Sequence, residues 1–420
     1  MSEQTHQKYP PSVQHGIPRL SPAQKGWKSV AIGKLVTEVV RPVEMGDDEI
    51  YTLVTAKRSR GGIVKREDLK GREIAVKNQF YIQAGDFIIS KRQIVHGACG
   101  FVPKELDGAI VSNEYLALNF TDKVIPQFWE FLTHTIYFQQ VCFHSSIGVH
   151  VEKMLFKVPR WYQWTVNIPT LKEQEKIASF LGAIDTRLTQ LRRKHELLQT
   201  YKRGVMQKIF SQQIRFKGDR GKPFPNWNSG PFYDCLNEIV DFRGRTPVKL
   251  GMEWGGGNIL SLSANNVKNG YIDFQAECNL ASEELHEKWM SGIDVRKDDI
   301  IFTMEAPLGN ATLIPDSQKY ILSQRVVLFK TSKNINNRFL LQLIWSPFFQ
   351  ESLKSLSTGT TAKGINQKSL KKININYPTI EEQEKISDFL LAIDKKIEAI
   401  SQQINLTEQF KKGLLQKMFV

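Results

Sequence analysis

Apolar side chains recur at alternating intervals of four and three residues in two long stretches of the chain. The first stretch carries Ile177, Leu181, Ile184, Leu188, Leu191 and Leu198, with His195 at the remaining position, and the second carries Ile386, Leu390, Ile393, Ile397, Ile400 and Ile404. A spacing of this kind places the side chains along one seam of an α-helix, as in a coiled coil. The pattern therefore predicts two long helices that pair along their apolar seams.

The two stretches are copies of one segment. Residues 169–210 align without a gap on residues 378–419, which lie 209 positions later, and 18 of the 42 aligned residues are identical. Both copies begin Pro-Thr-x-x-Glu-Gln-Glu-Lys-Ile, in which the threonine and the first glutamate have the spacing of a capping box. A proline directly before each box favours a helix start at this point. The repeat divides the chain into two half-chains.

The region before each long helix has the pattern of a mixed α/β domain with short strands. Residues 85–90 (GDFIIS) and 298–303 (DDIIFT), for example, each place a charged turn before a β-prone run. The sequence therefore predicts an α+β protein with a polar extension and two similar mixed α/β domains joined by two long recurring helices. We assign the extension to residues 1–18, the domains to residues 19–168 and 211–377, and the helices to residues 169–210 and 378–420.

The lengths of the helices indicate a spacer. A helix of about 39 residues is roughly 58 Å long at ~1.5 Å per residue, which exceeds the width of one small domain. Antiparallel pairing would relate the half-chains by a pseudo-two-fold axis, whereas parallel pairing, also possible, would place both domains at one end. Gly204 and Gly413 occupy matching helical positions at a cost of about 1 kcal/mol each relative to alanine, which suggests close approach of another backbone, such as a partner subunit.

The charge balance favours a polyanionic partner. The chain has 57 Lys and Arg against 43 Asp and Glu, a net charge of +14 at pH 7, and an excess of this kind is common among nucleic-acid-binding proteins. Its four cysteines lack the paired spacing of a zinc site or a disulfide framework. Neither an apolar leader nor a run of 18 apolar residues occurs. We therefore expect a cytoplasmic protein with reduced thiols.

Motifs for catalysis are missing from the sequence. We find no GxxxxGK[ST] phosphate loop, no HExxH and no paired CxxC. The Asn-Pro-Pro-aromatic or Asp-Pro-Pro-aromatic motif of adenine amino-methyltransferases is also missing. We therefore expect neither a catalytic residue nor a metal site in this chain.

Basic and amide side chains in loops are the candidates for DNA contact. At the 209-residue offset, the basic residues 56–61 (AKRSRG) align with the amide-rich residues 265–270 (NNVKNG). Arg and Lys suit guanine or phosphate, whereas Asn suits the major-groove edge of adenine, so two domains of one fold would recognise different sequences. The alternative is a pair of merely solvated loops. The candidate residues are Lys57, Arg58, Arg60, Lys91, Arg92, Arg243, Arg245, Asn265, Asn266, Lys268, Thr360, Thr361 and Lys363.

The paired motif PT-x-x-EQEKI…FL-x-AID…K-x-G…QK-x-F resembles that of DNA specificity subunits of type I restriction-modification systems. The resemblance covers essentially the whole chain. It implies two target-recognition domains that each recognise one half of an asymmetric bipartite DNA site, and two antiparallel helices that set the distance between the half-sites. The implied partners are double-stranded DNA, two methyltransferase (modification) subunits and restriction/translocase subunits. S-adenosylmethionine and ATP would bind those subunits, and this chain would bind no cofactor and be non-catalytic.

Two other functions remain as alternatives. A coiled-coil structural adaptor without DNA specificity would explain the helices, but it would leave the net positive charge and the divergent loops without a role. An enzyme that combines recognition and methyl transfer would need the missing methyltransferase motif and room for a further domain. A DNA-binding specificity subunit accounts for all of these features.

Overall fold

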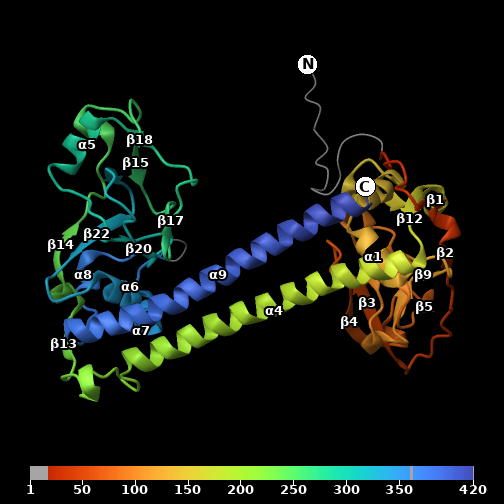
Figure 1. Cartoon of the computed structure of the whole chain (residues 1–420), viewed down its shortest axis with the longest axis horizontal. Helices are drawn as coiled ribbons and strands as arrows, with labels where there is room; N and C mark the ends of the chain where they lie inside the picture. The colour runs from red at the N-terminus through yellow and green to blue at the C-terminus, as the bar shows by residue number, and fades with distance from the viewer. Residues whose placement is uncertain (1–17, 360–362, 420) are drawn as a thin grey trace. The chain divides into compact units, whose positions relative to one another are not determined.

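The computed structural model of the chain describes residues 18–359 and 363–419. Contacts divide the chain into two compact units (Figure 1). Unit 1 combines the part of the chain up to residue 191 with the part from residue 403 onward, and unit 2 comprises residues 192–402. The two long helices, α4 (Leu171–Phe210) and α9 (Ile380–Phe419), each contribute one end to each unit. Within the described ranges, no helix has both the length and the apolar composition needed to cross a membrane.

Unit 1 is built on two four-stranded sheets. The first has the order β2-β9-β6-β7 and consists of β2 (Val36–Glu38), β9 (Tyr115–Phe120), β6 (Phe87–Ser90) and β7 (Cys99–Phe101). The second has the order β4-β3-β8-β5 and consists of β4 (Ile63–Lys70), β3 (Ile50–Ala56), β8 (Ile110–Ser112) and β5 (Gln79–Tyr81), with β3 and β8 parallel. The remaining elements are β1 (Lys28–Ala31) paired with β12 (Thr165–Ile168), β10 (Ser146–Ile147) paired with β11 (Leu155–Phe156), and the helices α1 (Pro126–Thr133), α2 (Ile136–His144) and α3 (Val158–Tyr162).

Unit 2 repeats this topology. Its first sheet has the order β14-β22-β19-β20 and consists of β14 (Leu236–Val240), β22 (Val326–Thr331), β19 (Ile300–Thr303) and β20 (Ala311–Leu313). Its second sheet has the order β18-β15-β21, from β18 (Leu280–Ala281), β15 (Ile259–Leu262) and β21 (Tyr320–Leu322), and β15 and β21 are parallel. The other elements are β13 (Asn228–Pro231) with β23 (Asn374–Tyr377), β16 (Val267–Lys268) with β17 (Tyr271–Ile272), α5 (Glu283–Met290), α6 (Asn337–Trp345), α7 (Pro347–Leu356) and α8 (Gln367–Leu370). The prediction of two similar mixed α/β domains is confirmed.

The ends of both long helices belong to the domain cores. In unit 1, Leu181 of α4 and Phe419 of α9 pack in one core, and the rings of Phe419 and Phe128 lie 5.1 Å apart between centroids. In unit 2, Ile209 of α4 and Ile386 of α9 likewise share a core. The interpretation of the whole helices as a spacer therefore needs correction, because only their central parts are outside the domain cores.

The predicted apolar seam is largely buried. Its buried members are Ile177, Leu181, Leu188, Leu191, Ile386, Leu390, Ile393 and Ile400. Ile184 and Ile397 pack at the margins of the cores of units 1 and 2, and Leu198, Ile404 and His195 are half-buried. The apolar periodicity thus located the inward face of both helices.

Two equivalent ion pairs show that the helices run antiparallel within each unit. In unit 1, the Lys411 Nζ of α9 lies 2.5 Å from the Asp185 Oδ1 of α4. In unit 2, the Lys202 Nζ of α4 lies 2.6 Å from the Asp394 Oδ1 of α9. Asp185 and Asp394 are equivalent in the repeat, as are Lys202 and Lys411. Because each pair joins the earlier part of one helix to the later part of the other, parallel pairing is excluded.

The Glu-Gln dipeptide of the repeated motif fastens each helix to its own domain. Gln174 is fully buried and donates to the backbone oxygens of Lys123 and Pro169, while its side-chain oxygen accepts from the Ile125 N–H. The Glu173 carboxylate accepts a hydrogen bond of 3.0 Å from the Trp27 indole. The capping-box spacing predicted that this carboxylate accepts a hydrogen bond from the backbone at the start of its own helix. In the structure it binds a side chain from a distant part of the domain instead.

The second copy makes the same contacts in unit 2. Gln383 is fully buried, and Glu382 accepts hydrogen bonds from the Trp227 indole and the Arg215 guanidinium. The guanidinium is further held by the backbone oxygen of Pro225, and its hydrogen bond to Glu382 raises the pKa of Arg215. The recurrence of the Glu-Gln dipeptide thus reflects a recurring joint between domain and helix.

Candidate nucleic-acid interface

The loops predicted to contact DNA follow the parallel strands of the second sheet in both units. In unit 1, β3 ends at Ala56 and the basic loop begins at Lys57, while its parallel neighbour β8 ends at Ser112. In unit 2, β15 ends at Leu262 and the amide-rich loop follows. The carboxyl ends of parallel strands are a frequent location of ligand sites in α/β folds. The structure therefore places the two loops at equivalent edges.

Two arginines of unit 1, Arg58 and Arg92, lie at this edge. Arg58 pairs with Glu152 at 2.7 Å and also donates to Gln93, and Arg92 pairs with Glu114 at 2.7 Å. The Arg92 hydrogen bond lowers the pKa of Glu114. Exposed pairs of this kind contribute only ~0–1 kcal/mol. Each arginine can therefore leave its carboxylate and bind a DNA phosphate with little loss of free energy.

Lysines add further positive charge to the same edge. Lys57 is exposed, and its backbone N–H closes the loop on the carbonyl of Gly62 at 2.9 Å. Lys91, the residue after β6, donates from its Nζ to the Asn113 carbonyl at 2.8 Å. Lys57 is the better placed of the two for phosphate contact, because the Lys91 ammonium already has a backbone partner.

Arg60 holds the loop in place. Its φ of 58° lies in the left-handed region, its backbone N–H donates to Gly97, and its Nε donates to the Thr133 carbonyl at 2.7 Å. Burial lowers the pKa of this guanidinium. Neighbouring His134 has its pKa lowered to about 4, first by burial and then by the charge of Arg60, so its imidazole is neutral at pH 7. We assign Arg60 to the structure of the loop.

The two adjacent asparagines of unit 2 lie in different environments. Asn266 is 1% exposed. Its side chain accepts from the N–H and hydroxyl of Ser263 and donates to the carbonyls of Asp273 and Ala276. The hydrogen-bonding groups of this amide are therefore used inside the domain. Asn265 is exposed, and within the described residues its side chain makes no hydrogen bond. Asn265 is therefore the one of the two that is accessible to DNA.

The remaining candidates of unit 2 vary in accessibility. Arg243 pairs with Asp241 at 2.6 Å, and Arg245 donates to the Trp289 carbonyl and lies 4.1 Å from the centroid of the Phe242 ring. These contacts favour structural roles for both arginines. Half-buried Lys268 and exposed Lys363 remain candidates, and Thr360 and Thr361 lie outside the described residues.

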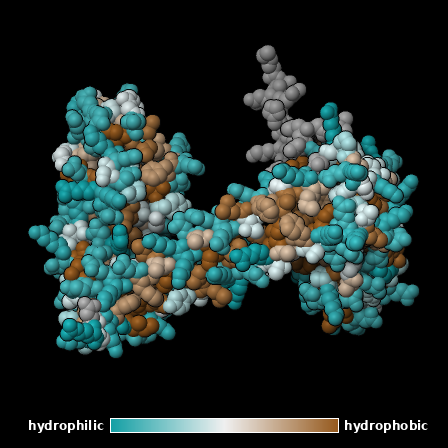
Figure 2. Space-filling view, in the orientation of Figure 1, coloured by the Kyte–Doolittle hydropathy of each residue, from teal (hydrophilic) through white to brown (hydrophobic). Residues whose placement is uncertain are grey.

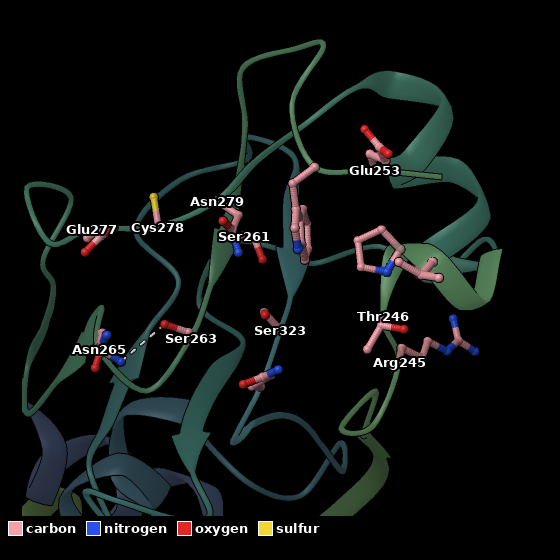
Figure 3. A pocket seen from close by; sticks show the side chains of 14 residues that line it. Arg245, Thr246, Glu253, Ser261, Ser263, Asn265, Glu277, Cys278, Asn279 and Ser323 are labelled. Atoms are coloured by element: carbon pink, nitrogen blue, oxygen red, sulfur yellow. Dashed lines mark hydrogen bonds between the residues drawn. The ribbon is translucent and has the colours of Figure 1, made fainter. Parts of the chain in front are cut away.

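A hollow of about 580 Å³ lies beside the same edge of unit 2 (Figure 3). Its lining comes from β15, from the segments before and after β15, and from the segments before β18 and after β21. Of these residues, only Arg245 and Asn265 were among the candidates predicted from the sequence. The lining includes Glu253, Trp254, Ser261, Asn265, Glu277, Asn279, Ser323 and Gln324. Their separation over about 70 positions explains why no motif marked them.

Comparisons with known proteins agree with this architecture. Residues 233–409 match the family described as the type I restriction modification DNA specificity domain. The chain is also 25% identical to the type I restriction enzyme MjaVIII specificity subunit of Methanocaldococcus jannaschii, with 93% of this chain and 91% of that protein covered. The chain is therefore similar, over nearly its whole length, to a type I restriction enzyme specificity subunit. This similarity agrees with DNA sequence recognition within such a system, the function that the resemblance implied.

Further relatives and solved structures extend the similarity. The putative MjaX specificity subunit of the same organism is 25% identical over 60% of this chain and 57% of its own length. A chain from a study of complex assembly and conformational transition in a type I system has a TM-score of 0.60 at 17% identity, covering 94% of this chain and 98% of its own. The HsdS subunit from Thermoanaerobacter tengcongensis has a TM-score of 0.52 at 17% identity, with 94% and 97% covered. These structures share the fold of this chain.

Proposed function

We propose that each unit of this specificity subunit recognises one half of an asymmetric bipartite DNA site. The proposal rests on the different side chains that the two units carry at the same edge of their second sheet. Unit 1 presents Lys57, Arg58 and Arg92 there, whereas unit 2 presents Asn265 and a lining of amides and hydroxyls. Basic groups suit guanine and phosphate, and amides suit adenine, so the two half-sites differ in sequence.

The long helices are the proposed determinant of half-site spacing. Each of α4 and α9 has 40 residues, and each begins in the core of one unit and ends in the core of the other. Because these ends are packed in the cores, a change in helix length cannot be absorbed by fraying. Helix length is thus the quantity that would set the distance between the half-sites.

Two apolar faces on the helices support docking of two methyltransferase subunits. The α4 face consists of Leu197, Tyr201 and Gly204, and the α9 face consists of the equivalent residues Leu406, Phe410 and Gly413. Their large side chains are 51%, 52%, 65% and 56% exposed, and Figure 2 shows apolar residues gathered on the exposed side of α9. Steps of four and three residues place each set on one side of its helix.

The two glycines of these faces have no packing role inside the described chain. A Cβ built at Gly204 or Gly413 would meet nothing within 4 Å, although glycine costs about 1 kcal/mol in a helix relative to alanine. We attribute the glycines to close approach of a partner backbone. In this proposal each face binds one methyltransferase subunit, restriction/translocase subunits join the complex, and S-adenosylmethionine and ATP bind those partners. The specificity subunit itself is non-catalytic.

Mapping of methylated adenines tests the proposed function. The chain is expressed with its modification partner in a host without other adenine methyltransferases, and modified positions are located across the genome. We expect one asymmetric motif of two short specified parts separated by unspecified bases. A continuous motif, or no modification by an intact complex, would contradict the bipartite proposal.

Replacement of Lys57 by glutamine should weaken binding to the mapped duplex and make it less dependent on salt. The slope of log K against log salt concentration should fall by up to ~0.9 for one lost phosphate contact. The matched control is Lys28→Gln, because Lys28 is an exposed lysine on β1, outside the second sheet. Equal slopes for Lys57→Gln and the unmodified chain, with both folded, would remove Lys57 from the interface.

A further inference from the structure

The hollow of unit 2 has the position of a ligand site. It lies where the parallel strands β15 and β21 end, and its lining includes Ser261 of β15, Ser323 and Gln324 just after β21, and residues of the loop before β18. Its volume of about 580 Å³ falls within the usual range for small-ligand pockets, ~300–1,000 Å³. Figure 3 shows side chains from these segments surrounding one space. The hollow is therefore lined by several separate segments around the end of the sheet and not by a single loop.

Ser261 supplies an unpartnered polar group in this lining. The residue is 2% exposed, and its hydroxyl makes no hydrogen bond within the described residues. Its backbone N–H is occupied by the carbonyl of Asn279 at 3.0 Å. A buried hydroxyl without a partner costs about 1–3 kcal/mol. A ligand in the hollow that forms the missing hydrogen bond with the Ser261 hydroxyl would offset this cost.

The other lining groups define the chemistry of that ligand. Trp254 offers an aromatic surface and is steadied by Trp289, with ring centroids 5.3 Å apart. Exposed Asn279 and Gln324 offer amides with both a donor and an acceptor. Glu253, Glu277 and Arg245 also line the hollow, and the Arg245 guanidinium already donates to the Trp289 carbonyl. Two carboxylates against one guanidinium disfavour a phosphate group. The combination suits a flat, uncharged heteroaromatic ring with a hydrogen-bonding edge.

We propose that this hollow receives a single nucleobase of DNA turned out of the base stack. The ring would stack on Trp254, and its edge would bind Asn279 and Ser261. Side chains that contact a paired base in a groove must protrude, whereas Ser261 and Ser323, 2% and 7% exposed, are recessed. Only an unstacked base can reach them. The inference rests on the proposed function and adds to it a second mode of recognition in unit 2.

The test uses the full chain and labelled single-stranded 12-mers of dA, dC, dG or dT. One of the four should bind more tightly than the others. Ser261→Ala should weaken that binding about two- to tenfold, as loss of one hydrogen bond, while the midpoint of thermal unfolding stays equal or rises. Trp254→Ala should weaken it roughly five- to hundredfold, as loss of one stacking contact.

Ser145→Ala is the matched control. Ser145 lies in unit 1, is fully buried and also has a hydroxyl without a hydrogen bond in the described residues, so its loss should leave DNA binding unchanged. Equal affinities for Ser261→Ala, Ser145→Ala and the unmodified chain would overturn the proposal. So would free nucleosides that bind as tightly as the 12-mers, because they would indicate a small-molecule site. Binding of the mapped duplex, measured in parallel, separates these results from failure of the proposed function.

Discussion

Replacement of Gln383 by leucine is expected to destabilise unit 2 by about 3 kcal/mol. The Gln383 side chain accepts from the Asn336 N–H at 2.8 Å and donates to the carbonyls of Asn334 and Pro378 at 3.0 and 2.9 Å. Leucine has a similar volume but forms none of these bonds. Three backbone groups would lose their partner at once, at a cost of about 1 kcal/mol or more each. Urea unfolding of the full chain measures the loss.

The repeat provides a second site for the same experiment. Gln174→Leu should destabilise unit 1 in the same way, because Gln174 makes equivalent bonds. Glu175→Gln and Glu384→Gln, at exposed positions of the two motifs, serve as controls and should unfold with the unmodified chain. Hydrogen exchange assigns each loss to its unit. Unchanged stability of both leucine variants would show that the buried glutamines do not fasten the helices.

Two aspartates on the α9 face are expected to remove one of two methyltransferase subunits from the complex. Leu406→Asp combined with Phe410→Asp replaces exposed apolar side chains with charges, and residues at the centre of an interface each contribute about 2 kcal/mol or more. The affinity of that face should fall at least roughly a hundredfold. Analytical ultracentrifugation should then show one methyltransferase subunit per chain instead of two.

The equivalent change on α4, Leu197→Asp with Tyr201→Asp, should remove the other subunit, and all four changes together should remove both. Asn405→Asp with Lys412→Gln lowers the charge of α9 by the same amount at exposed positions that are not three or four residues from Leu406 or Phe410, and it should leave the complex intact. An unchanged complex after all four apolar replacements would rule out these faces as the docking sites.

Sequence periodicity predicted the helices well because burial along one seam imposes a regular spacing on the sequence. The roles of Glu173 and Gln174 were not predictable in the same way. Their partners, Trp27 and the backbone near Lys123, come from distant segments, and only the folded domain brings them to the helix. A recurring dipeptide therefore signalled importance without indicating the contact.

The candidate DNA contacts show the same limit at closer range. Asn265 and Asn266 are chemically identical neighbours, yet the turn that begins at Ser263 directs one amide inward and leaves the other exposed. Ser261 carried no signal at all, because a serine in a β-strand is unremarkable until its missing hydrogen bond is seen. Residue type predicted which chemistry was present, whereas accessibility depended on the fold.

The two helix ion pairs make the repeat complementary to itself. Asp185 and Lys202 lie 17 positions apart on α4, and Asp394 and Lys411 lie 17 positions apart on α9, so each copy carries both the acid and the base that the other copy requires. A half-length chain with one domain and one helix would contain every group needed to pair with a second copy of itself. Such a homodimer would recognise an inverted repeat. The asymmetry of the proposed target would then come from the two domains, which diverged after duplication, and not from the helices.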